Sequence, residues 1–98
     1  MNINAYISSH KDDMICMLRD LVEIDSASEN IEGINQLARY LETRFKEAGL
    51  SVSRERQENG GDIVICQLNG SGKKTLVLGH FDTALPMGSV KENPFYIK

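Results

Sequence analysis

One stretch of the sequence repeats its apolar residues with the period of an α-helix. Positions spaced at i, i+3, i+4, i+7, i+11 and i+14 form one continuous stripe: Ile34, Leu37, Ala38, Leu41, Phe45 and Ala48. Such a stripe lies along one side of a helix and belongs to the protein core. Gly49 follows at once, and glycine readily takes the left-handed conformation that closes a helix. The pattern predicts a helix over residues 34–48.

The segments on either side predict a second helix and three strands. Residues 4–23 carry apolar side chains at helical spacing in their later part, which indicates an amphipathic helix, and the polar residues 24–30 suit a loop. Alternating or β-branched residues predict strands over 50–55, 62–68 and 75–79, with a hairpin turn at Asn69-Gly70 between the last two. Residues 76–78 are apolar throughout, which is typical of a central strand covered on both faces.

This order of elements predicts an α/β fold in which two N-terminal helices pack against a mixed sheet. At 98 residues the chain is one domain at most. Residues 93–98 resemble the start of a further strand, and no turn or cap follows them. We therefore expect residues 1–98 to be the N-terminal portion of a larger catalytic domain.

Composition argues against several classes of partner. The net charge is −3 and the Lys and Arg residues are scattered, whereas nucleic-acid binding requires a dense positive surface. The longest apolar run, residues 14–18, is too short to span a membrane, and no secretory signal opens the chain. Cys16 and Cys66 are far apart, so we expect two reduced, partly buried thiols in a cytoplasmic protein.

His80 and Asp82 directly follow the apolar residues 76–78. In an extended chain, side chains two residues apart project to the same face. An imidazole is a suitable zinc ligand, and a neighbouring carboxylate can orient it, which makes His80 the candidate ligand and Asp82 its support. Spacing alone favours a structural interpretation, in which His80 caps the sheet and Asp82 begins a turn. One His and one Asp also fall short of the four ligands of a zinc site.

A wider set of residues resembles a known family. Gly79-His80-Phe81-Asp82-Thr83, with Pro86, Gly88 and Pro94-Phe95 after it, is similar to the first metal motif of the zinc metallopeptidases that include aminoacylases, acetylornithine deacetylase, succinyl-diaminopimelate desuccinylase and glutamate carboxypeptidase. Upstream segments match in the same order, namely Leu21-Val22-Glu23-Ile24-Asp25-Ser26 and Gly49-Leu50-Ser51-Val52. Glu32-Gly33-Ile34 and Tyr40-Leu41-Glu42 look most like the glutamate carboxypeptidase branch.

The resemblance implies a three-layer α/β/α domain that hydrolyses the amide bond of an acyl-amino acid or peptide, using two zinc ions. His80 would bind one zinc, and Asp82 would hold His80 in place in a supporting catalytic role. The other ligands and the general base of the family match nothing in residues 1–98, so we expect this chain alone to be inactive and to bind zinc weakly.

The alternative function is a non-catalytic structural or oligomerising fragment of a degenerate relative. Its open sheet edges would favour a homo-oligomer. A phosphate-binding loop at residues 70–75 is not expected, because Gln67 and Lys74 stand where that motif needs Gly and Ser or Thr.

Overall fold

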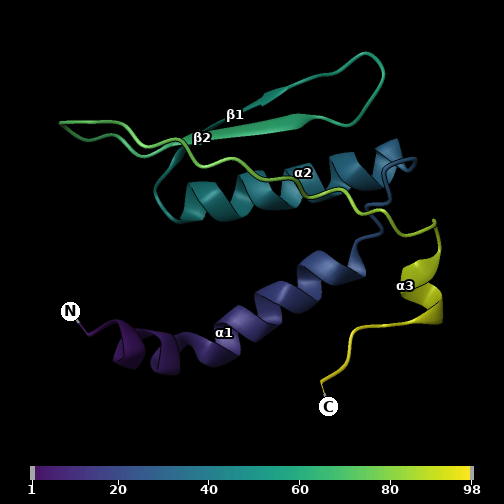
Figure 1. Cartoon of the computed structure of the whole chain (residues 1–98), viewed down its shortest axis with the longest axis horizontal. Helices are drawn as coiled ribbons and strands as arrows, with labels where there is room; N and C mark the ends of the chain where they lie inside the picture. Colours follow the sequence, from purple (N-terminus) through teal and green to yellow (C-terminus); the bar gives the residue numbers. More distant parts are fainter. Residues whose placement is uncertain (1, 98) are drawn as a thin grey trace.

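The computed structural model describes residues 2–97 and is built around one central helix, α2. The hairpin of β1 and β2 lies on one side of α2, and α1 lies on the other (Figure 1). Helices and a small two-stranded antiparallel sheet are consistent with the predicted α/β class. In chain order the elements are α1 Ile3–Glu23, α2 Ile31–Glu47, β1 Ser51–Glu55, β2 Ile63–Gln67 and α3 Ser89–Glu92.

Local sequence explains where α2 begins and ends. The side-chain Oδ1 of Asn30 accepts a hydrogen bond from the N–H of Gly33 at 2.9 Å, which caps the helix three residues earlier than the apolar stripe predicted. Ala48 ends the helix, and Gly49 follows with φ of 91°. The predicted closing role of Gly49 is therefore confirmed.

The core is formed by the apolar stripe of α2 and by the loop that precedes the helix. Ile34, Leu37 and Ala38 are buried, and Ala27 from the loop is buried beside them. Ser26 is buried as well. The prediction that the stripe is core is confirmed for its first two turns, whereas Phe45, further along, is only half-buried.

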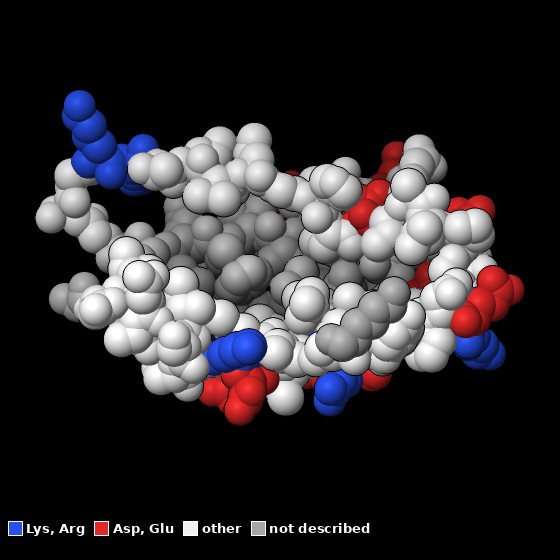
Figure 2. Space-filling model, turned by 60° about the horizontal axis from the view of Figure 1, so that its bottom comes forward, with Lys and Arg blue, Asp and Glu red and all other residues white. Residues whose placement is uncertain are grey.

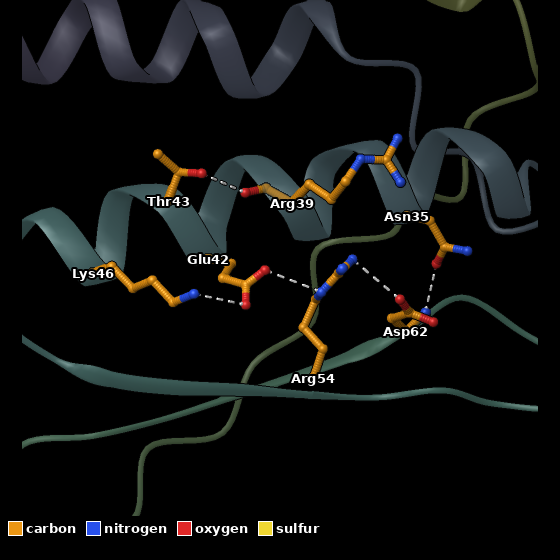
Figure 3. A network of polar contacts seen from close by, with 7 residues as sticks. All are labelled: Asn35, Arg39, Glu42, Thr43, Lys46, Arg54 and Asp62. Atoms are coloured by element: carbon orange, nitrogen blue, oxygen red, sulfur yellow. Dashed lines mark hydrogen bonds and ion pairs between the residues drawn. The ribbon is translucent and has the colours of Figure 1, made fainter.

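The hairpin confirms the first two predicted strands. Ser51 pairs with Gln67 and Glu55 with Ile63, in antiparallel register. Polar contacts tie the hairpin to α2 (Figure 3). Arg54 of β1 lies 3.2 Å from the Glu42 carboxylate of α2 and 3.3 Å from that of Asp62.

Asn35 completes this attachment from α2. Its Oδ1 accepts a hydrogen bond from the N–H of Asp62 at 2.7 Å, close to Arg54 (Figure 3). The residues just before β2 are thus held to the helix by a side chain, and the same bond satisfies a backbone donor that no strand reaches.

The prediction of a third strand over residues 75–79 is wrong. Leu76, Val77 and Leu78 are 80, 87 and 84% exposed, and within residues 2–97 no strand pairs with them. Val77 and residues 79–82 line a pocket of about 730 Å³ together with residues of α2 and β2. Strand structure requires a hydrogen-bonded neighbour, which this segment lacks. For the same reason the Asn69-Gly70 step does not close a hairpin, and the sheet described here is antiparallel and not mixed.

Helix α1 forms as predicted but does not pack on the sheet. Helix α2 lies between α1 and the hairpin (Figure 1). Several large apolar side chains of α1 are exposed, among them Ile7, Met14 and Leu18. Two side-chain contacts link α1 to other parts of the chain. Tyr40 Oη of α2 donates a hydrogen bond to Asp20 at 3.0 Å, and the Arg19 guanidinium lies 5.5 Å from the centre of the Phe95 ring. The expected packing of both helices on one sheet is therefore wrong for α1.

The end of the chain and the cysteines also depart from prediction. Residues 94–97 form no strand, residue 98 lies outside the described residues, and the short helix α3 was not predicted. Cys16 and Cys66 are both free, as expected, but they are exposed and not partly buried.

The surface carries charges of both signs. On the face that Figure 2 shows, Lys and Arg side chains lie around the rim, several next to Asp or Glu, and the hollowed centre is uncharged. Within residues 2–97 no helix combines the length and the apolar character needed to cross a membrane.

Candidate functional site

The loop before α2 and the segment after residue 80 meet at one junction. Ala27 and Thr83 form an isolated parallel bridge, in which Thr83 N–H donates to Ser26 O at 2.8 Å and Ser28 N–H donates to Thr83 O at 2.9 Å. The Ser26 hydroxyl donates to Phe81 O at 3.1 Å. The junction therefore holds the His80–Asp82 segment against the buried end of the loop.

Acidic side chains of the same loop extend the junction toward α3. The Asp25 carboxylate accepts hydrogen bonds from Gly88 N–H at 2.6 Å and from Ala27 N–H at 3.3 Å. The bond from Gly88, followed by that from Ala27, lowers the pKa of Asp25 below its ordinary value. Glu29 adds a longer contact of 3.4 Å with Met87 N–H.

His80 and Asp82, the two residues singled out in the sequence, lie in contact. Nδ1 of His80 is 3.3 Å from Oδ1 of Asp82 and 3.0 Å from the backbone oxygen of Asp82. Both oxygens are acceptors only, so Nδ1 carries the proton in the neutral ring. Nε2 then keeps its lone pair, and the His80 side chain is 84% exposed. This is the tautomer that can bind a metal through Nε2.

Asp82 is shared between His80 and Ser28. The Ser28 hydroxyl donates to Oδ2 of Asp82 at 2.7 Å, while Oδ1 faces His80. This hydrogen bond is the main cause that lowers the pKa of Asp82, and the charge of His80 contributes less. Asp82 is therefore an anion at neutral pH, the form that best accepts a proton-bearing Nδ1.

The described residues do not complete a metal site. Within residues 2–97 no group of three or more His, Cys, Asp or Glu side chains is placed to hold a metal ion. His80 fits a single zinc ligand with its orienting carboxylate, whereas a zinc site takes about four ligands. The geometry of this chain accounts for one ligand and its support.

A largely apolar pocket of about 510 Å³ opens beside the junction. Leu37 and Leu41 of α2 line one part and Leu85 another, and His80 and Ser26 contribute polar atoms. His80 is thus one of the residues that line two pockets, this one and the pocket lined by Val77, residues 79–82 and residues of the hairpin.

Sequence reasoning missed the part played by the loop. Residues 24–30 were predicted to be a polar connection, yet Ser26 and Ser28 bind the segment that carries His80, and Asp25 binds Gly88 at the start of α3. Asp25 and Ser26 lie in one of the motifs that carry the family resemblance, but neither residue type at that spacing indicates which distant segment it contacts. Long-range pairing of this kind has no local signal.

Comparison with known proteins supports part of the family resemblance. No protein-family model matches the chain. The chain is 31% identical over 88 residues to carboxypeptidase G2 of Pseudomonas sp. (strain RS-16). The match takes in 87% of this chain, and the chain spans about a fifth (21%) of the length of that carboxypeptidase. The similarity supports a carboxypeptidase-like relationship for the aligned part of the chain.

Proposed function

We propose that this chain supplies a zinc ligand, His80, and its orienting carboxylate, Asp82, to a zinc-dependent hydrolase of amide bonds. The observation that carries the proposal is the pair of acceptors on Nδ1 of His80, at 3.0 and 3.3 Å, which leaves Nε2 as the metal-binding atom on an exposed ring. The partial similarity to a carboxypeptidase supports the hydrolytic chemistry. Zinc, when bound, would polarise the scissile carbonyl and lower the pKa of a bound water.

The chain's own residues would prepare the ligand. Asp82 keeps the proton on Nδ1 and so leaves the lone pair of Nε2 for the metal, as carboxylates behind metal-bound histidines do. Ser26 and Thr83 hold the backbone of the segment, so that the ring is presented from a fixed base. No general base is assigned to this chain.

The other zinc ligands and the general base are proposed to lie elsewhere in a larger catalytic domain. We infer that residues 1–98 are the N-terminal portion of a three-layer α/β/α domain in which two zinc ions are bound. Two observations support this inference. The described residues provide one ligand only, and the matching carboxypeptidase is about five times longer than the matched segment. The substrate class is an acyl-amino acid or a peptide with a C-terminal, glutamate-like residue.

Zinc titration of the 98-residue chain tests the ligand. Calorimetry should show weak binding at one site, far from the roughly 10–16 kcal/mol of complete structural zinc sites. His80→Ala should abolish it, and His10→Ala, which changes the other histidine of the chain, should not. Equal binding by the His80→Ala variant would refute the assignment. Tight stoichiometric zinc binding or amidase activity in the unmodified chain would refute the inference that it is incomplete.

The gene sequence beyond residue 98 gives a second test. Continuation into Gly-Pro-Gly-x-x-Asp and then a Glu-Glu pair would support the hydrolase. Their absence would favour the second candidate function, a structural or oligomerising module. One observation favours that candidate, namely the exposed apolar residues 76–78 with no strand beside them among residues 2–97.

A further inference from the structure

We propose that Ser28 is a positioning residue that sets the orientation of His80 through Asp82. The inference rests on the proposed function, because it concerns how the candidate zinc ligand is held. The starting observation is that the two oxygens of the Asp82 carboxylate contact different residues. Oδ2 of Asp82 accepts the Ser28 hydroxyl at 2.7 Å, and Oδ1 lies 3.3 Å from Nδ1 of His80.

The carboxylate needs such a restraint because it is accessible to water. The Asp82 side chain is 42% exposed, and a carboxylate that turns about its Cβ–Cγ bond would offer its oxygens to solvent as readily as to Nδ1. A hydrogen bond to an anion is short and comparatively strong. The bond from Ser28 occupies one oxygen and so keeps the other toward the imidazole.

Ser28 is itself held at a fixed place. Its N–H donates to Thr83 O at 2.9 Å, and the preceding residue, Ala27, is buried in the bridge. The hydroxyl therefore starts from backbone that the core immobilises, although the residue's own surface is exposed. Thr83 O also lies 3.1 Å from the hydroxyl, but the shorter contact and the negative charge favour Asp82 as the acceptor.

The hydrogen bond from Ser28 to Asp82 joins residues that are 54 positions apart in the sequence. This bond joins the loop before α2 to the segment that carries Asp82, and Asp82 in turn contacts His80. A change at Ser28 should thus reach a ring that Ser28 does not touch, which is the property that distinguishes a positioning residue from a merely structural one.

The experiment compares Ser28→Thr with Ser28→Val in the 98-residue chain. These side chains have nearly the same shape, and Thr alone keeps the hydroxyl. Nitrogen-15 NMR of the neutral imidazoles reports which ring nitrogen carries the proton. Ser28→Thr should keep the Nδ1–H form of His80, whereas Ser28→Val should lower its share. His10, whose Nδ1 bonds to Tyr6 O at 2.9 Å, serves as the internal reference and should not change.

Zinc titration gives a second readout. Ser28→Val should bind zinc about 3–10-fold more weakly than Ser28→Thr, a smaller loss than the roughly 10–100-fold seen for direct partners of metal ligands. Asp82→Ala should show the larger loss. Ser53→Ala, at an exposed position of β1, is the control for an unrelated hydroxyl.

The outcomes separate this inference from the function on which it rests. Identical His80 spectra in the Ser28→Thr and Ser28→Val variants would overturn the role of Ser28, whether or not the two variants differ in zinc affinity. A changed His80 spectrum in a chain that binds no zinc would support the role of Ser28 and reject His80 as a ligand. If Ser28→Val fails to fold, Ser28→Ala gives the same comparison without a β-branched side chain.

Discussion

The carboxylate of Asp25 accepts a hydrogen bond from the N–H of Gly88 at 2.6 Å, across 63 residues of sequence. This contact fastens the loop before α2 to the start of α3, and Gly88 meets it with φ of 88°, in the left-handed region. The junction that presents His80 therefore depends on a charged acceptor and a backbone donor far apart in the chain.

The first prediction concerns acid. The pKa of Asp25 is lowered in the folded chain, chiefly by the bond from Gly88. A lowered folded pKa means that its stabilisation is fully present above the ordinary value of 3.8 and is lost as pH falls below it. The urea midpoint of the wild type should fall between pH 5 and pH 3 by more than that of Asp25→Asn. Glu29→Gln, whose contact with Met87 is longer, should behave as the wild type. If the urea midpoints of the wild type and of Asp25→Asn fell equally between pH 5 and pH 3, Asp25 would be excluded as the group responsible.

The second prediction concerns Gly33 in the first turn of α2. A Cβ at this position would collide with the backbone oxygen of Asp25 and with the Asn30 side chain that caps the helix. Gly33→Ala should lower the free energy of unfolding by about 2–3 kcal/mol, as in other overpacked sites. Gly70→Ala is the matched control, because a Cβ there meets nothing within 4 Å, and it should change stability by less than about 0.5 kcal/mol. Chemical denaturation of both variants checks this, and a neutral Gly33→Ala would mean that the loop can move away.

The third prediction concerns the core. Leu37 belongs to the buried stripe of α2 and is 2% exposed, so Leu37→Ala leaves a cavity that the small core cannot refill. We expect a loss of about 2–3 kcal/mol. Leu68→Ala, at a residue that is 80% exposed, should cost less than about 0.5 kcal/mol. Urea unfolding followed by circular dichroism measures both, and similar midpoints would contradict the assignment of the core.

The fourth prediction concerns association. The apolar side chains of residues 76–78 and their unpaired backbone favour pairing between copies. Sedimentation velocity should show association that increases with concentration, and Val77→Lys should shift the chain toward monomer. Leu18→Lys, on the exposed side of α1, should have less effect. A compact wild-type monomer at all concentrations would show that residues 76–78 do not pair.

Sequence reasoning succeeded where the signal is local. The stripe from Ile34 to Ala48, with Gly49 after it, specifies an amphipathic helix because its period and its terminator lie within the same few turns. The alternation in residues 50–55 and the β-branched residues in 62–68 specify the strands β1 and β2 in the same way. His80 and Asp82, two residues apart, were also within reach of local reasoning, and they do lie in contact.

Residues 76–78 mark the limit of that reasoning. Their apolar character predicts a strand, but a strand exists only with a neighbour that accepts and donates its hydrogen bonds, and in residues 2–97 none is placed there. The pattern of apolar residues therefore overestimated the sheet. The order of elements led us to expect α1 on the sheet, whereas α2 separates α1 from the hairpin.

The sequence by itself determined the helices α1 and α2, the strands β1 and β2 and the pair His80–Asp82, since each depends on residues that are close along the chain. Only the tertiary structure decided that Ser28, more than fifty residues away, binds Asp82 of this pair, and that Asp25 binds Gly88 at the start of α3. The physical reason is that a hydrogen bond depends on distance in space, and the spacing of residues along the chain does not encode which loop will come within 3 Å of which carboxylate.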